Sequence, residues 1–325
     1  MPILSKLEAD LETSATLHLL EKLQQMVGRA IRGKDDVIRL ALVALFARGH
    51  LLIEDVPGVG KTTLARALAR SLSCTYQRIQ FTSDMLPSDV IGVSVFNPKS
   101  QQFEFRPGPV FAHVVLADEI NRTTPKTQSA LLEAMNETQV TIDNHARQLP
   151  QPFIVIATQN PAEHHGTFPI PESQLDRFLM RIEVGYPSEA SEKEILRGTA
   201  ASDPLDEIQP VMSADEVVAV QKTVRHVTVD EELLSYLLAV VRRTRCHEQL
   251  RLGVSPRGSM SIYRAAQSLA LLEGRSYCIP DDFKSLVIPV FAHRCVLRSR
   301  AAAPARGAGA TDVLQEILDE TPVPL

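Results

Sequence analysis

The sequence predicts an α/β fold: a mostly parallel, five-stranded sheet covered by helices on both faces, followed by a smaller, all-helical domain. Three observations support this prediction. Five short apolar runs alternate with helical patterns up to residue 187, a glycine-rich turn joins the first run to a helix, and the strand signals fade after residue 187. Apolar strands that alternate with helices are typical of parallel sheets buried on both faces.

The elements of the first domain, residues 1–187, are expected in a simple order. Helical patterning covers residues 5–48 and ends at a polar stop. Turn-like residues between alternating runs predict two inserted hairpins, near 92–106 and 138–150. The expected strands are 51–55, 76–81, 113–118, 153–158 and 178–184.

Helical patterns dominate the rest of the chain, which we assign to a second, all-helical domain, residues 188–298. The expected helices are 213–225, 230–247, 258–273 and 281–293. Residues 299–325 begin with a small-residue-rich run typical of a flexible connection and end in a short helical segment.

Composition narrows the classes of function. The 325 residues are 44% hydrophobic and carry a formal net charge of -5, so the chain has no overall basic footprint for a phosphate backbone. Nucleic acid is therefore not the expected partner. Four widely spaced cysteines, the lack of a signal-peptide pattern and the lack of an apolar run of roughly 20 residues favour a cytoplasmic protein with no membrane insertion.

A phosphate-binding loop is predicted where EDVPGVGKTT lies between the first strand and a helix. Glycines let the backbone approach phosphates, and the N-terminus of the following helix favours negative charge. The candidate nucleotide-binding residues are Pro57, Gly58, Val59, Gly60, Lys61, Thr62 and Thr63. Asp55 stands where the usual pattern has its first glycine. The alternative, a glycine turn before a helix with a surface lysine, is less favoured in this context.

Two carboxylates follow the third strand in VVLADEINR. In an open α/β sheet, the carboxyl end of this strand lies beside the phosphate loop. We therefore expect Asp118, with Thr62, to hold Mg²⁺ and Glu119 to act as the general base towards water. Asn160, at the end of the next apolar strand, is expected to orient that water, although a residue that caps the turn before Pro161 is a serious alternative.

Two arginines complete the candidate site. Arg177, in PESQLDRF, is expected to act as an arginine finger supplied by a neighbouring subunit, with a local ion pair to Asp176 as the alternative. Arg257, in GVSPRGSM, lies in the first turn of a helix, where its charge opposes the helix dipole. That conflict favours an external anion, and a surface arginine is the alternative.

With these residues in place, the sequence resembles the MoxR-type AAA+ ATPases. The segments that carry the resemblance extend from GHLLIEDVPGVGKTTLA through FRPGPVFAHVVLADEINRTTPKTQSALLEAM and ATQNP to FPIPESQLDRF and SPRGSM. The resemblance implies an AAA+ αβα core with a helical lid, assembled as a ring that is usually hexameric, with ATP at the subunit interfaces.

The resemblance also assigns roles and partners. It makes residues 58–63 similar to Walker A, Asp118 and Glu119 to Walker B, Asn160 to sensor 1, Arg177 to the arginine finger and Arg257 to sensor 2, acting in cis or in trans. It implies a chaperone that remodels or matures protein clients, often with a partner carrying a von Willebrand A domain and sometimes with metal insertion.

The leading hypothesis is therefore an ATP-hydrolysing, oligomeric remodeller of proteins. A nucleotide-dependent motor on DNA is the alternative, but the hairpin tips offer only Lys99 and Arg147, besides His145. A chelatase-type motor subunit and a module that switches on ATP occupancy without turnover also remain open. The presence of Glu119 argues against the last of these.

Overall fold

The computed structural model of the chain describes residues 2–160, 166–198, 203–298 and 309–323. Its centre is a five-stranded sheet in the order β2-β5-β8-β1-β9, and every neighbouring pair is parallel. The predicted five-stranded sheet is thus confirmed. The strands are β1 (Leu51–Glu54), β2 (Tyr76–Gln80), β5 (Val114–Asp118), β8 (Ile154–Gln159) and β9 (Met180–Ile182).

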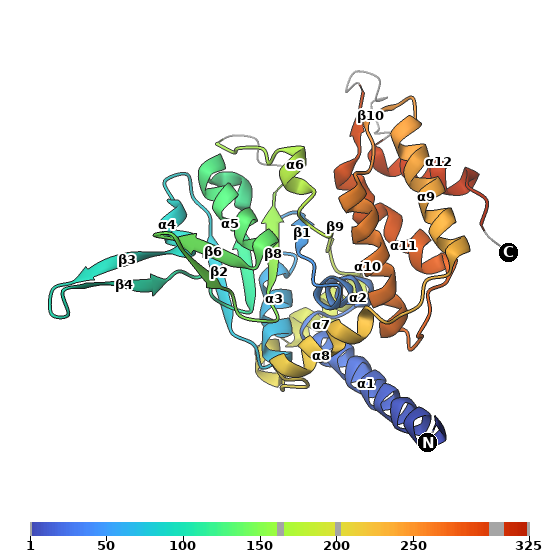
Figure 1. Ribbon diagram of the computed structural model, residues 1–325, viewed down its shortest axis with the longest axis horizontal. Coiled ribbons are helices and arrows are strands. Elements are labelled where there is room, and N and C mark those ends of the chain that lie inside the picture. Colours follow the sequence, from blue (N-terminus) through green and yellow to red (C-terminus); the bar gives the residue numbers. More distant parts are fainter. Residues whose placement is uncertain (1, 161–165, 199–202, 299–308, 324–325) are drawn as a thin grey trace.

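Helices cover both faces of this sheet (Figure 1). Successive side chains of a strand point to opposite faces. Accordingly, Leu116 and Ile156 belong to one apolar cluster, whereas Val115 and Val155 belong to another. The first cluster packs against α1 (Pro2–Ala30), α2 (Asp35–Phe46) and α3 (Lys61–Ser71), and the second packs against α4 (Pro87–Ile91) and α5 (Pro125–Glu137).

The helical region expected over residues 5–48 is two helices rather than one. Residues 31–34 separate α1 from α2, and Gly33 has a φ of +69°, a conformation that interrupts a helix and suits glycine. This break brings the loop towards the phosphate-binding segment, because a Cβ added at Gly60 would lie 3.6 Å from Ile31 Cδ1.

Both expected hairpins are present. The first, β3 (Gly92–Asn97) with β4 (Gln102–Pro107), extends as an arm away from the body (Figure 1). The second is β6 (Gln139–Ile142) with β7 (His145–Gln148). The hairpins meet at their bases, where the Arg147 guanidinium lies over the Phe105 ring, 4.0 Å from its centroid.

The described residues after β9 are mainly helical and include a short antiparallel pair, β10 (Leu250–Leu252) with β11 (Val296–Leu297). Its helices are α7 (Glu189–Gly198), η2 (Pro204–Glu207), α8 (Ala214–Val224), α9 (Glu231–Cys246), α10 (Pro256–Leu272), α11 (Pro280–Phe291), η3 (Ala292–Arg294) and α12 (Ala310–Glu320). Two short helices, η1 (Ile120–Arg122) and α6 (Glu172–Leu175), precede β9. Residues 299–308 of the predicted connection lie outside the described part.

The lid helices share an apolar cluster with α1, α2 and one face of the sheet. The proposed boundary at residues 187 and 188 falls between β9 and α7 and stays a prediction.

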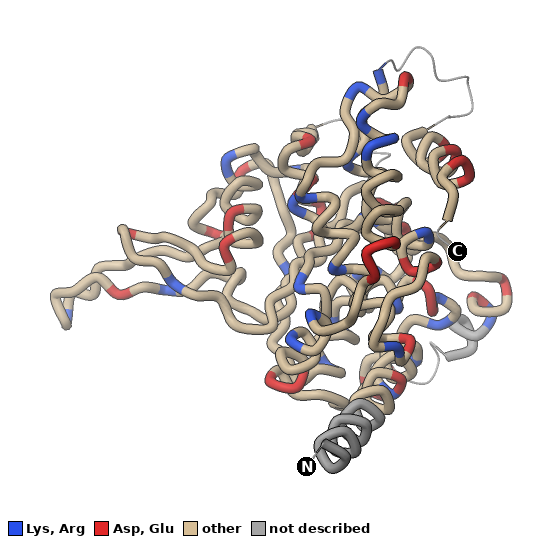
Figure 2. The backbone as a smooth tube through the Cα atoms, turned by 45° about the vertical axis from the view of Figure 1, so that its right-hand side comes forward, with Lys and Arg blue, Asp and Glu red and all other residues tan. Residues whose placement is uncertain are grey.

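Among the described helices, none is long and apolar enough to cross a membrane. Lys and Arg are interspersed with Asp and Glu along the body, and charged residues are sparse on the arm (Figure 2).

Candidate active site

The phosphate-binding segment connects β1 to α3 through two glycines in the left-handed region. Gly58 has a φ of +86° and Gly60 a φ of +96°, and Gly60 is the residue that caps α3. A Cβ at Gly58 would meet nothing within 4 Å, so conformation rather than crowding requires glycine there. The turn therefore presents the N-terminus of α3 to the space beyond the sheet.

Lys61 rests against the loop itself. Its Nζ donates a hydrogen bond to the Asp55 carbonyl oxygen at 2.8 Å. Burial lowers the pKa of Lys61, and the charges of Asp55, Asp118 and Glu119 oppose that shift. These carboxylates keep an ammonium favourable at this position, and the ammonium can exchange the carbonyl for a phosphate oxygen.

Asp55 stands where the usual phosphate-loop pattern has its first glycine, and its side chain has a structural role. Its side chain is 9% exposed. One oxygen accepts the Val56 N–H at 2.7 Å, and the other accepts the N–H groups of Val184 at 2.7 Å and Gly185 at 2.6 Å. The carboxylate thus fastens the phosphate loop to the chain that leaves β9 towards α7.

A cavity of about 390 Å³ opens over this loop and collects most of the predicted residues. Its lining comprises Pro57, Gly58, Gly60, Lys61, Thr62, Thr63, Arg78, Gln80, Asp118, Glu119, Thr158 and Asn160. Val59 is placed differently, because its side chain packs against the apolar core. The loop, both carboxylates and Asn160 therefore meet at the carboxyl edge of the sheet, as expected.

Thr158, which the sequence reasoning missed, organises the two carboxylate residues. It is 1% exposed, and its hydroxyl donates to Asp118 Oδ1 at 2.6 Å while it accepts the Glu119 N–H at 2.9 Å. Glu119 has a φ of 57° and a ψ of 49°, a left-handed conformation that is costly for a residue with a Cβ. The bond to Thr158 supports that strained turn.

Arg78 and Gln80 of β2 join the same network. Arg78 donates to Asp118 Oδ2 from Nη2 at 2.6 Å and from Nε at 3.2 Å, and Nη2 also donates to Gln80 Oε1 at 2.7 Å. Gln80 Nε2 donates to Glu119 Oε2 at 2.9 Å, and Arg122 Nε reaches the same oxygen at 2.9 Å. The alternation in YQRIQF places Arg78 and Gln80 on one face of β2, and the pairing of β2 with β5 brings that face to Asp118 and Glu119.

Arg177 lies at the opposite edge of the sheet. It precedes β9, whose first residue Met180 pairs with Leu51 at the start of β1, whereas the phosphate loop leaves from the end of β1. Burial lowers the pKa of Arg177, and the nearby charge of Arg257 lowers it further. The alternative was a local ion pair between Arg177 and Asp176. In the structure, Asp176 Oδ1 instead pairs with Arg294 Nε at 2.7 Å.

Arg257 lies at this same edge, in the first turn of α10. Its Nη2 donates to Asn136 Oδ1 at the end of α5. Neither Arg257 nor Arg177 lines the cavity over the phosphate loop. Beside Asn136 a larger open groove, of about 1020 Å³, separates the ends of α2 and α5 from lid helices α8, α9 and α10.

Comparisons with known proteins agree with this architecture. Sequence models match the ATPase family associated with various cellular activities (AAA) over residues 50–180 and the AAA lid domain over residues 242–317. A solved structure from Cytophaga hutchinsonii, described as that of a candidate ATPase, is similar with a TM-score of 0.91 and 34% identity, covering 99% of both chains.

Relatives extend the similarity over nearly the whole chain. An uncharacterized protein, YeaC, of Bacillus subtilis is 48% identical across 94% of this chain and 95% of its own. Chaperone MoxR1 of Mycobacterium tuberculosis is 42% identical across 89% of this chain and 79% of its own, and Protein MoxR of Methylorubrum extorquens is 31% identical across 93% and 94%. The chain therefore belongs to the MoxR-type family of AAA+ ATPases and is an ATPase.

Proposed function

We propose that this ATPase is a chaperone that works as a ring of identical subunits, hexameric as the family resemblance implies, and that it remodels or matures other proteins. The observation that carries the proposal is the separation of the site into two halves. The phosphate loop and carboxylates lie at one edge of the sheet, and Arg177 and Arg257 lie together at the other. A neighbouring subunit is needed to bring the halves together.

The residues of the first half, the phosphate loop and the carboxylates, would have separate roles in hydrolysis. Lys61 and the N–H groups of residues 58–63 would hold the β- and γ-phosphates. Glu119 would take a proton from the attacking water, and Asn160, which lines the same cavity, would orient that water.

Thr62 and Asp118 suit Mg²⁺ as part of this first half. Both supply oxygen, the ligand that Mg²⁺ prefers, and both line the same cavity. Across the described ranges, no group of three or more His, Cys, Asp or Glu residues forms an all-protein metal cage. This fits an ion that takes its remaining ligands from phosphates and water. When bound, Mg²⁺ neutralises charge on the phosphates.

The second half supports action in trans for both arginines. About 10 Å of strand separates the start of β1, beside Arg177, from the start of the phosphate loop. Arg257 touches the end of α5 rather than the loop. We propose that Arg177 stabilises transition-state charge on the neighbour's nucleotide and that Arg257 binds the same nucleotide.

The hairpins are the proposed route from hydrolysis to a client. Near the tip of the arm, Phe96 and Phe103 pack edge to face with centroids 5.4 Å apart, and Phe103 is 74% exposed. Exposed apolar surface of this kind marks interaction sites. The Arg147–Phe105 contact at the base would pass motion from the second hairpin to the arm.

The trans arrangement is tested by ATP hydrolysis measured against protein concentration, with mass followed by light scattering. Specific activity is expected to rise as rings form. Arg177→Ala should assemble and bind ATP but lose hydrolysis by roughly a thousandfold. Activity that is independent of concentration and of Arg177 would refute a shared site.

Rings assembled from two different variants test action in trans directly. Glu119→Gln subunits should bind ATP without turnover, yet they keep an intact Arg177. Mixed with Arg177→Ala subunits, they should restore part of the hydrolysis, because an intact finger meets an intact Glu119 wherever a Glu119→Gln subunit faces the site of an Arg177→Ala subunit. The same mixture made with Arg257→Ala tests that residue separately. Mixtures as inactive as their components would exclude action in trans.

Partner and pathway are proposals from the family resemblance. We propose a partner with a von Willebrand A domain, metal-cofactor insertion as one form of client maturation, and a cytoplasmic location. Affinity capture with Glu119→Gln rings and ATP, followed by mass spectrometry, tests the partner. Stimulation of hydrolysis by DNA would instead favour the DNA-motor alternative, and stimulation by a metal–tetrapyrrole system would favour the chelatase alternative.

A further inference from the structure

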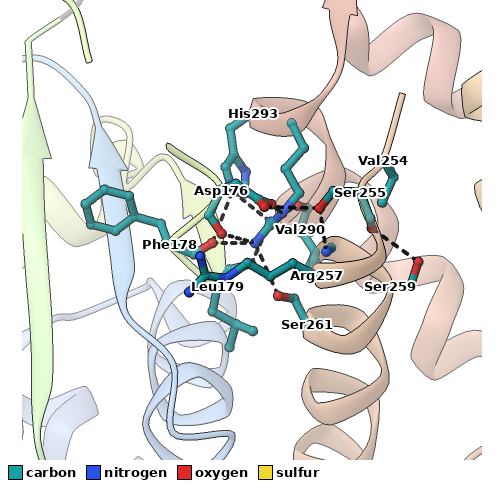
Figure 3. Close-up of polar contacts among 12 residues, drawn as sticks. Asp176, Phe178, Leu179, Val254, Ser255, Arg257, Ser259, Ser261, Val290 and His293 are labelled. Atoms are coloured by element: carbon teal, nitrogen blue, oxygen red, sulfur yellow. Dashed lines mark hydrogen bonds and ion pairs between the residues drawn. The ribbon is translucent and has the colours of Figure 1, made fainter. Parts of the chain in front are cut away.

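A single buried arginine connects the lid to the segment that carries Arg177. Arg294, in η3, is 4% exposed. Its Nε donates to Asp176 Oδ1 at 2.7 Å, its Nη2 to the Phe178 carbonyl at 2.6 Å, and its Nη1 to the Leu179 carbonyl at 3.1 Å. Figure 3 shows Asp176, Phe178 and Leu179 gathered around this contact. Arg294 thus holds the chain on both sides of Arg177 without touching its side chain.

The same guanidinium is anchored within the lid. It donates to Ser261 Oγ of α10 at 3.2 Å and to the Val290 carbonyl of α11. A guanidinium carries five N–H groups in a fixed fork, so it can hold several acceptors in one geometry. A buried charge is costly unless it is paired and hydrogen-bonded. These contacts therefore fix the segment before β9 relative to both lid helices.

Arg257 is connected to the same contacts of Asp176 and Arg294. Ser255, the residue that caps α10, donates from Oγ to Asp176 Oδ2 at 3.0 Å, and Arg257 follows two residues later. Gly258 lets this turn approach, because a Cβ there would lie 2.9 Å from Arg294 Cδ. The Asp176 carboxylate thus joins Ser255 at the start of α10 to Arg294. Figure 3 labels Asp176, Ser255 and Arg257 around this contact.

We propose that Arg294 is a positioning residue for ATP hydrolysis in the neighbouring subunit: it fixes the backbone around Arg177 to the lid, so that Arg177, Arg257 and the lid move as one body. The inference rests on the proposed action of Arg177 in trans. Arg294 itself does not reach the nucleotide, so its loss harms the neighbour's site and spares the subunit's own.

The test uses Arg294→Lys, which keeps the charge and loses the fork. Rings of this variant should bind ATP with unchanged affinity and hydrolyse it roughly tenfold more slowly. Mixed with Glu119→Gln subunits, they should regain activity severalfold, as Arg177→Ala does. This rescue separates a misplaced finger from a general defect, because an unfolded subunit offers no active site to rescue.

Arg275→Lys is the matched control. Arg275 is also a paired lid arginine, with Nη2 2.6 Å from Asp282 Oδ1, and it makes no contact with residues 176–179. Its variant should hydrolyse ATP at the wild-type rate. Asp176→Asn is a second variant for the same contact, milder because the carbonyl bonds of Arg294 remain, and it should show the same rescue.

The outcomes are distinguishable. Wild-type activity in Arg294→Lys, or a loss that Glu119→Gln subunits fail to rescue while they rescue Arg177→Ala, overturns the role of Arg294 and leaves the proposed function intact. If Arg294→Lys does not fold, the same criteria apply to Asp176→Asn. If Arg177→Ala itself is not rescued, action in trans fails, and the inference fails with it.

Discussion

His50, just before β1, should make the stability of this protein depend on pH. The side chain is 6% exposed. Its Nδ1 accepts the Val155 N–H at 3.0 Å, so the other nitrogen, Nε2, carries the proton and donates to the Met135 carbonyl at 2.9 Å. Both contacts suit the neutral ring. Burial lowers the pKa of His50 from 6.5 to about 4, and the charge of Arg257 adds to the shift.

The sign of the effect follows from proton binding. Between pH 6.5 and about 4 the unfolded chain protonates His50 and the folded chain does not, so the free energy of unfolding falls as the pH is lowered. The contribution is complete above pH 6.5 and lost as the pH falls to about 4, for a total of about 3 kcal/mol. Between pH 7.5 and 5 the loss amounts to about 2 kcal/mol.

The assay is urea unfolding at pH 7.5, 6 and 5 for the wild type and His50→Asn. The wild type should lose about 2 kcal/mol more than the variant over this range. The pKa of buried His293 is also lowered by burial, but this residue is present in both proteins and cancels. His226→Asn, at an exposed position, should behave as the wild type does. Equal losses in the wild type and His50→Asn would refute the reasoning.

Three further predictions concern the site. Thr158→Val should reduce stability by about 1–2 kcal/mol and slow hydrolysis, because it removes a hydrogen-bond partner from two part-buried groups, Asp118 Oδ1 and the Glu119 N–H, whereas Thr158→Ser should retain both properties in thermal unfolding and ATPase assays; equal effects would contradict this. Asp55→Asn should speed hydrogen exchange of the amides of residues 184–185 by roughly tenfold, and unchanged exchange would remove the proposed tie. Arg78→Gln should lower the Mg²⁺ concentration needed for half-maximal hydrolysis, because Arg78 no longer competes for Asp118; a higher requirement would show that Arg78 instead orients the carboxylate.

The sequence by itself determined the sheet and the first half of the site. Apolar runs buried on both faces are visible as local patterns, so five strands and both hairpins could be predicted close to their observed bounds. The phosphate loop is also visible as a local pattern, because its glycines, Lys61 and Thr62 all lie within residues 58–62. Asp118 and Glu119 could be placed beside it because carboxyl ends of parallel strands share one edge. The break at Gly33 was missed, since helical patterning continues on both sides of it.

Only the tertiary structure decided which distant side chains meet. Arg78 reaches Asp118 because β2 pairs with β5 in one register, and no pattern within YQRIQF specifies that partner. Arg294 lies over a hundred residues from Asp176 in the chain, and their contact depends on how the lid packs against the segment before β9. Strand pairing and lid docking are set by the summed packing of many side chains. Local sequence therefore supplies the chemical groups, and packing selects which of them work together.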